Sequence, residues 1–447
     1  MKKTFLYILI PIISNGQYVI VNDINIKGNY TTKPFVIQRE LTFKKGDTLY
    51  DITKHIQLSQ QNLLKTSLFN FAEIDTIKVS DKYYNIIINL TERWYLWPIP
   101  IFEQASRNIN TWIYEKDYNK YNYGLFIAKA NFRGRNELIR AIARFGFREM
   151  YGFAYSIPYF LNNKNLGVEF KSLYYRQKHL PYKNVNNKPI LVASNEYLYM
   201  NYLFNFELNY RPKFFSFHTF NIAYSFEYIT DSLFKLNPNF LIDSLSKIKY
   251  ITMSYSFRHD LTNSVSYPTR GYVLETEIEL NKSLDKNLII PIINLNTAYY
   301  YKITPRLFNA HSINSKYSFN YKNSYILNKA FGYQTSPRGY ELYLIDGYAY
   351  FLLQNSIRYM LVKPHIKNIY KLKNERFAKI HYAFYLSLNG DLGYVINKFN
   401  EPLTNQWLYG YGIGLDFVTY YDLTLQTEFS INKFGKKGLY FHISKNI

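Results

Sequence analysis

The 447-residue chain contains no cysteine. Disulfides, zinc–thiolate sites and cysteine nucleophiles are therefore excluded, and an exported protein of this size must be held by its hydrogen-bonded ladders and its core. The chain also lacks an apolar run of 18 or more residues, which a membrane-spanning helix would need. A membrane form would have to be a closed barrel, because only helices and closed barrels satisfy all backbone hydrogen bonds within lipid.

Sequence signatures of enzymes are missing as well. Neither His-Glu-x-x-His nor Gly-x-Ser-x-Gly occurs, and the eight histidines form no cluster with the spacing of metal ligands. We therefore expect that the protein is not an enzyme and uses no metal or cofactor.

The charge is strongly one-sided, with 54 Lys and Arg against 32 Asp and Glu and a formal net charge of +22. Most of the basic residues are lysines, and they are scattered along the chain without a dense block. This distribution argues against a nucleic-acid partner and is compatible with contact to anionic lipid head groups.

Aromatic residues are abundant, with 48 Tyr and 34 Phe. Tyrosine suits a membrane interface because its ring prefers hydrocarbon and its hydroxyl prefers water. A second interpretation is codon bias in an AT-rich genome, since Lys, Asn and Ile are also plentiful. Codon bias does not account for where the tyrosines lie along the strands.

The N-terminus has the pattern of an export signal. Lys2 and Lys3 precede the apolar run 5–13, which the small and polar residues 14–17 follow. This order is that of the basic, apolar and exit regions of a signal peptide, and the apolar run is too short to span a bilayer. We predict a signal peptide over residues 1–16.

Residues 18–94 predict a small domain with the order strand, helix, helix, strand, strand. A cap at Thr31 or Thr32 with Pro34 in the first turn indicates the first helix, and helical spacing of apolar residues from Asp51 indicates the second. The predicted elements are a strand over 18–27, a helix to Leu41, a turn at 45–47, a helix from 51, and strands over 71–79 and 83–90. Residues 95–120 are expected to be a linker.

From about residue 121 the chain alternates as strand after strand. Tyr409, Tyr411 and Ile413 share one face of such a strand, and Gly410 and Gly412 share the other. The polar faces carry small residues and isolated charges that suit a wet lumen, and the series is too long for one soluble sandwich. We predict a transmembrane β-barrel of antiparallel strands over 121–447.

The tetrad Pro337-Arg338-Gly339-Tyr340 interrupts this series of strands. An arginine inside a lumen needs an anion, and a carboxylate can accept from its guanidinium at two points. Gly339 permits a turn that a Cβ would obstruct, and Tyr340 can pack on the inner wall. We predict that Arg338 pairs with Asp391 and that this contact pins the loop inside the barrel. The alternative is an exposed turn arginine.

The N-terminal domain resembles a polypeptide-transport-associated (POTRA) domain. The resemblance rests on the order of its elements and on short motifs at matching spacing: Gly28-Asn29, Arg39-Glu40-Leu41, Gly46-Asp47, Leu68-Phe69-Asn70 and Glu92-Arg93. In that family the exposed sheet edge is thought to accept client strands by β-augmentation, which unpaired backbone groups allow. The other interpretation is a passive spacer.

The remainder resembles the barrel of the BamA/TamA outer-membrane assembly superfamily, also called the bacterial surface antigen family. The motifs that match are Asn131 to Asn136 as the first hairpin, the loop motif Pro268, Arg270, Gly271 and Tyr272, the tetrad as the inward-folded sixth loop, Asp391-Leu392-Gly393 as the acidic motif of the thirteenth strand, and Leu439 to Ile443 as the terminal strand. Relatives often carry a Glu on the twelfth strand, but residues 354–358 contain none, so the usual three-membered network is in doubt.

The resemblance implies about 16 antiparallel strands, an even number as such barrels require, with the last five at 345–360, 378–394, 407–419, 421–432 and 437–446. It also implies an insertase that folds other barrels into the bacterial outer membrane, with the POTRA-like domain in the periplasm. Lateral opening would occur where the first and last strands meet, here predicted at 121–131 against 438–445. The implied partners are unfolded outer-membrane proteins and outer-membrane lipid, with periplasmic chaperones or accessory lipoproteins as further partners. The alternatives are a two-partner protein-secretion pore, whose second POTRA domain and plug helix do not fit before Tyr18, and a solute channel or purely structural barrel.

Overall fold

The computed structural model describes residues 18–104, 121–319, 321–368, 379–419 and 421–445. The predicted signal peptide lies outside these residues. Within the described part, no helix combines the length and the apolar character needed to cross a membrane.

The N-terminal domain has the predicted order of elements, with one additional two-residue strand between the two helices. It contains β1 (Val19–Lys27), α1 (Pro34–Glu40), β2 (Thr48–Leu49), α2 (Ile52–Lys65), β3 (Phe69–Lys78) and β4 (Tyr83–Glu92). The sheet order is β2-β1-β4-β3, with β1 parallel to β4. The two helices pack on this sheet around a core that includes Ile37, Leu63, Phe69, Ile86 and Ile88, all fully buried.

One of the two helix starts was predicted correctly. The Asp51 carboxylate accepts a hydrogen bond from the Lys54 N–H at 2.9 Å and caps α2. The predicted threonine cap of α1 is wrong, because Lys33 occupies the cap position and makes no side-chain cap bond. The Thr32 hydroxyl donates instead to the buried Glu92 carboxylate at 2.6 Å, which ties the start of α1 to the end of β4.

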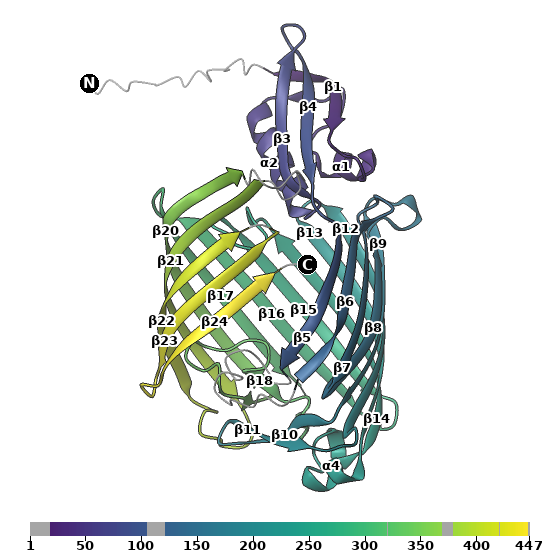
Figure 1. The fold of residues 1–447 in the computed structure, drawn as a ribbon, viewed down its shortest axis with the longest axis vertical. Coiled ribbons are helices and arrows are strands. Elements are labelled where there is room, and N and C mark those ends of the chain that lie inside the picture. Colours follow the sequence, from purple (N-terminus) through teal and green to yellow (C-terminus); the bar gives the residue numbers. More distant parts are fainter. Residues whose placement is uncertain (1–17, 105–120, 320, 369–378, 420, 446–447) are drawn as a thin grey trace, which may run out of the picture.

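The second domain is one antiparallel sheet of 16 strands rolled into a barrel (Figure 1). The strands are β5 (Leu96–Gln104), β6 (Tyr121–Phe132), β7 (Glu137–Gly146), β8 (Arg148–Ile157), β9 (Leu166–Gln177), β12 (Tyr199–Lys213), β13 (Ser216–Ile229), β14 (Lys247–Asp260), β15 (Gly271–Ser283), β16 (Ile289–Lys302), β17 (Leu307–Ser318), β20 (Ala349–Asn368), β21 (Lys379–Ile396), β22 (Trp407–Thr419), β23 (Leu423–Asn432) and β24 (Lys437–Lys445). The predicted number of strands is confirmed, and the last four predicted ranges agree with β21 to β24 within about two residues. The predicted range 345–360 is displaced, because β20 begins at Ala349 and continues to Asn368.

The first barrel strand lies earlier in the chain than predicted. β5 pairs with β6 from Leu96 opposite Lys129 to Gln104 opposite Tyr121, so the barrel begins at Leu96 and the proposed linker over 95–120 is wrong for its described part. Pro98 and Pro100 caused this error, because proline argues against a strand except at the edge of a sheet. The barrel edges are therefore β5 and β24, and the predicted seam strand 121–131 is the second strand.

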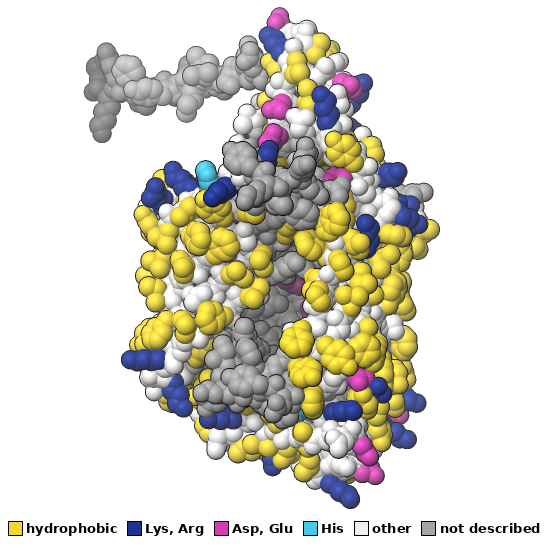
Figure 2. Space-filling view, viewed as in Figure 1, with side chains coloured by type: hydrophobic (Ala, Val, Ile, Leu, Met, Phe, Trp, Pro, Cys, Tyr) yellow, Lys and Arg dark blue, Asp and Glu magenta, His cyan; other side chains and the backbone are white. Residues whose placement is uncertain are grey.

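The barrel wall alternates between an apolar outer face and a smaller, polar inner face. Tyr411 and Ile413 on β22 are 55% and 46% exposed, whereas Asp416 on the same strand is 2% exposed. On the face of the barrel that Figure 2 shows, hydrophobic side chains cover much of the described wall, and Lys and Arg lie mainly toward its two ends. This distribution is the one expected of a lipid-facing belt.

The two ends of the barrel differ. The end next to the N-terminal domain (the POTRA end) carries mostly short connections, among them a 3-10 turn at Phe160–Asn162 between β8 and β9. The opposite end (the distal end) carries the hairpin of β10 (His179–Val185) and β11 (Lys188–Ala193), the helix α4 (Asp231–Leu236) and a 3-10 turn at Ile242–Ser244. The segment between β17 and β20, with its short strands β18 (Lys329–Phe331) and β19 (Ile345–Asp346), starts at the distal end and folds into the barrel (Figure 1). We call its residues 321–348 the lumen loop.

Candidate functional site

The tip of the lumen loop lies against the inner wall formed by β21, β22 and β23. The Arg338 guanidinium contacts the Asp391 carboxylate on β21 through Nη1, and the Arg338 backbone N–H donates to the same carboxylate at 3.0 Å. Arg338 Nε donates at 2.9 Å to Glu428 on β23. The structure therefore brings the two predicted partners together and adds a second carboxylate.

Glu428 is the residue that the sequence-based prediction missed. Position 354 on the twelfth strand is a glutamine, and its amide donates to Asp391 at 3.1 Å. The twelfth strand therefore contributes an amide in place of the glutamate that relatives often carry there. The second carboxylate comes from the fifteenth strand. Its inward direction could be read from the alternation of Glu428 with Phe429, but its distance from Arg338 depends on the strand register across the barrel.

The charges of this cluster are enclosed. Asp391 and Glu428 have side chains that are 0% and 1% exposed, and the Arg338 side chain is 16% exposed. Burial lowers the pKa of the Arg338 guanidinium, but the nearby carboxylates offset that effect and raise its pKa above the ordinary value. The arginine therefore stays charged, and removing its partners would leave a buried cation without compensation.

Small residues let the loop backbone approach the wall closely. Gly339 has a φ of +80°, and a Cβ there would lie 2.8 Å from the backbone nitrogen of Asn432. A Cβ on Gly410 would lie 1.9 Å from the Arg338 carbonyl oxygen, and one on Gly393 would lie 2.7 Å from the Phe331 ring. The loop thus rests on glycines, because any larger inner side chain at these positions would displace it.

Tyr340 completes the contact of the tetrad with the wall. Its side chain is 1% exposed and packs with residues such as Phe331, Leu352 and Leu408 in one buried cluster. The Asn432 amide donates to the Gly339 carbonyl at 2.9 Å. Loop and wall therefore share an apolar core as well as an ion cluster, which supports the predicted packing position of Tyr340.

The predicted loop motif marks a second inward-folded segment, the turn 261–270 at the POTRA end. Its residues Pro268 and Arg270 belong to the turn, Gly271 begins β15 with a φ of +94°, and Tyr272 is 38% exposed on that strand. Arg358 on β20 donates to the Pro268 carbonyl at 3.2 Å. The motif therefore shapes a turn that reaches the opposite wall of the barrel.

The side chain that this turn inserts is Tyr267, which the sequence-based prediction did not select. Its hydroxyl donates at 2.6 Å to Asp416 on β22, and the Arg358 guanidinium lies 4.5 Å from the centre of its ring. The ring also packs at 4.6 Å against that of Tyr385 on β21. Two separate segments, one from each end, therefore hold the same side of the barrel wall.

The N-terminal domain contacts the barrel rim at several points. Asn131, near the end of β6, donates to the Thr32 hydroxyl at 2.8 Å, and the motif predicted as the first hairpin forms the turn between the second and third strands. Ion pairs join the ends of β12 and β14 and the turn before β23 to the domain: Arg211 with Glu40 at 2.7 Å, Lys65 with Asp260 at 3.1 Å, and Arg93 with Asp422 at 2.7 Å. These contacts from separate strands fix the domain over the rim.

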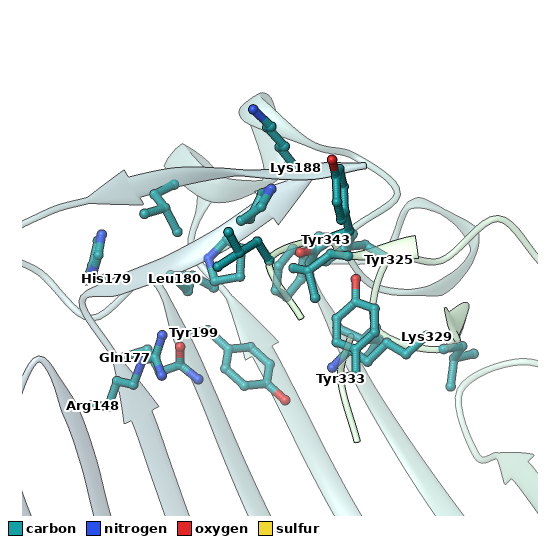
Figure 3. Close-up of a pocket in the computed structure, with 18 of the residues that line it drawn as sticks. Arg148, Gln177, His179, Leu180, Lys188, Tyr199, Tyr325, Lys329, Tyr333 and Tyr343 are labelled. Carbon is teal, nitrogen blue, oxygen red and sulfur yellow. The ribbon is translucent and has the colours of Figure 1, made fainter. Parts of the chain in front are cut away.

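A cavity of about 790 Å³ lies between the lumen loop and the wall near the distal end. Figure 3 shows the β10–β11 hairpin across this cavity, with Tyr199 and Gln177 below it. Its lining includes Lys188, Lys329 and Tyr440. A second cavity, of about 570 Å³, lies beside the tetrad, and its lining includes Arg338, Glu428 and His442.

The comparisons with known proteins agree with this architecture. The POTRA family model, described as surface antigen variable number repeat, matches residues 19–93, and no curated protein sequence matches the chain. Among solved structures, BamA from Haemophilus ducreyi lacking POTRA domains 1–3 is 15% identical, with 95% of this chain and 84% of that chain covered and a TM-score of 0.52. CdiB from Escherichia coli is 11% identical, with 95% and 76% covered and a TM-score of 0.56.

The order of the elements, the POTRA match and the inward-folded loop lead to one assignment. Residues 19–93 form a POTRA domain, and the described part of the chain, in which this domain precedes a 16-stranded barrel, has the fold seen in BamA and CdiB.

Proposed function

We propose that this protein inserts and folds other β-barrel proteins in the bacterial outer membrane, with its POTRA domain in the periplasm. The apolar belt of the barrel supports the membrane location. The proposed partners are unfolded outer-membrane proteins and outer-membrane lipid, together with periplasmic chaperones or accessory lipoproteins. The activity consists of strand pairing and needs neither catalysis nor a cofactor.

The observation that carries this proposal is the seam between the first and last strands. β5 and β24 are the two ends of the 16-stranded sheet, and in the described part of the chain no backbone ladder joins them. Figure 1 shows both strands at the front of the barrel, on either side of the seam. A sheet edge with unpaired backbone groups is a template for a further strand.

Two segments held inside the lumen favour lateral opening over passage through the barrel. The lumen loop is held by a buried ion cluster and an apolar contact, and the turn 261–270 is held by Tyr267. A solute channel would have to displace both segments. At the seam, by contrast, strands can separate without disturbing either one.

A protein-secretion pore is the second candidate, and the likeness to the CdiB fold favours it. In that function a client would cross the lumen, so the loop would have to leave its place against β21–β23. The insertase requires no such displacement, and for that reason we rank it first.

Depletion of the protein in its own organism distinguishes these functions. Quantitative proteomics of the outer membrane should show a general loss of barrel proteins if the chain is an insertase. Loss of one secreted substrate with unchanged barrels would instead support the secretion pore. Unchanged barrels and unchanged secretion would contradict both functions and favour a solute channel.

A further inference from the structure

We infer that the two edges of the seam are unequal, and that a client strand pairs with β24 because prolines block the edge of β5. This inference rests on the proposed insertase function and specifies which edge of the same seam accepts the client. It follows from the direction in which each backbone N–H points.

On β5 the odd-numbered residues pair with β6. The Tyr95 carbonyl accepts from the Ala130 N–H at 2.8 Å, and the register continues through the strand without a shift. Because backbone groups alternate in direction along an antiparallel strand, the even-numbered residues point their backbone toward the seam. Two of these residues, Pro98 and Pro100, have no N–H.

At the start of β5, one more backbone group is unavailable for pairing with a further strand. The Leu96 carbonyl, which by the same alternation faces the seam, accepts a hydrogen bond from the Trp94 indole. Between residues 96 and 102 the edge therefore offers N–H donors only at its two ends. Proline on an edge strand is a known means of preventing further strand pairing.

On β24 the alternation has the opposite consequence. The Lys436 carbonyl accepts from the Asn432 N–H at 3.1 Å, and β23 and β24 keep one register from Ile431 opposite Lys437 onward. Even-numbered residues of β24 therefore face β23 and odd-numbered residues face the seam. Each of the odd-numbered residues of β24, Leu439 and Ile443 among them, carries a backbone N–H.

The side chains of β24 indicate the kind of strand that fits beside it. Leu439 and Ile443 are 55% and 68% exposed and continue the outer apolar face of the sheet, whereas Tyr440 between them is 6% exposed and points inward. A partner strand in the same sheet must follow the same alternation. The matching partner is an extended segment with apolar residues at every second position, as a membrane barrel strand has.

Disulfide trapping tests this inference, because the chain has no cysteine of its own. Full-length Leu439→Cys and Phe102→Cys variants, each altered at an exposed position near the distal end of one edge, are placed in phosphatidylcholine vesicles. A urea-unfolded small outer-membrane barrel protein, with single cysteines along its first and last strands, is then added. A Pro98→Val/Pro100→Val variant in the Phe102→Cys background restores the missing donors.

We expect the client to be trapped on β24 about fivefold or more over β5, the factor that one ordinary hydrogen bond contributes to an equilibrium. The proline replacements should raise trapping on β5 by a similar factor. Equal or greater trapping on β5 with the prolines present would overturn the inference and leave the insertase function intact. Absence of trapping on both edges would contradict the function and the inference together.

A second variant blocks the other edge. Leu439→Pro removes a seam-facing N–H from β24 without removing a donor used by β23, so the barrel should fold, and Leu439→Val is its matched control. Folding is checked by the heat-dependent shift of the barrel on a denaturing gel. A folded Leu439→Pro variant that inserts clients as fast as Leu439→Val would also overturn the inference.

Discussion

Removing both carboxylates from Arg338 should release the lumen loop. In an Asp391→Asn/Glu428→Gln variant both neighbours keep their size but lose their charge, and each exchanges one acceptor oxygen for an NH2 donor. The guanidinium, whose side chain is 16% exposed, then remains in the lumen without an anion. The loop can relieve this only by moving out of the wall.

The free-energy cost of releasing the loop follows from the burial of the two carboxylates. Breaking a buried ion pair costs about 3–5 kcal/mol, which corresponds to a change of about 10²- to 10⁴-fold in the equilibrium between the docked and released loop. Asp391→Asn alone should cost less, about 1.5–3 kcal/mol, because Glu428 still accepts from Arg338 Nε at 2.9 Å.

Trypsin cleavage within the lumen loop measures this equilibrium in the purified full-length protein in detergent. When the loop opens and closes faster than it is cut, the cleavage rate follows the population of the released form. Glu275→Gln is a matched control, since Glu275 contacts Arg258 at 3.4 Å with both side chains exposed, and an exposed pair contributes at most about 1 kcal/mol.

The reasoning would be refuted by a simple result. If the double variant is cut within the loop no faster than the Glu275→Gln control and keeps the same thermal stability, the ion cluster does not hold the loop. If the Asp391→Asn variant is cut as fast as the double variant, Glu428 contributes nothing to holding the loop.

Three further predictions concern neighbouring contacts. Gly410→Ala should raise loop cleavage, since its Cβ would lie 1.9 Å from the Arg338 carbonyl oxygen; unchanged cleavage would contradict the close approach. Tyr267→Phe removes the 2.6 Å bond to Asp416 and should lower barrel stability by about 1.5–3 kcal/mol, measured by thermal unfolding against wild type. Burial raises the pKa of Glu341 to about 8, so the folded loop favours the protonated form and loses stability as pH rises from about 4.5 to 8; loop cleavage should therefore rise between pH 6.5 and 8, and Glu341→Gln should remove that rise.

Local patterns in the sequence were sufficient for most of the barrel. Along β21 to β24, lipid-facing and lumen-facing side chains alternate with a period of two, and this period depends only on neighbouring residues. Predicted limits such as 407–419 and 437–446 accordingly agree with β22 and β24 within one residue. β5 was not predicted, because Pro98 and Pro100 disrupt the local strand pattern, although an edge strand tolerates prolines.

The contacts across the barrel could not be derived in this way. Arg338 and Asp391 were paired through a family motif, and Glu428 and Tyr267 were missed, because which inner side chains meet depends on the closure of the whole sheet and the register of many strands. By itself the amino-acid sequence determined the class of structure, the strands and the direction in which most side chains point. Only the tertiary structure decided which of them meet, since partners such as residues 338 and 428 are brought together by the sheet as a whole.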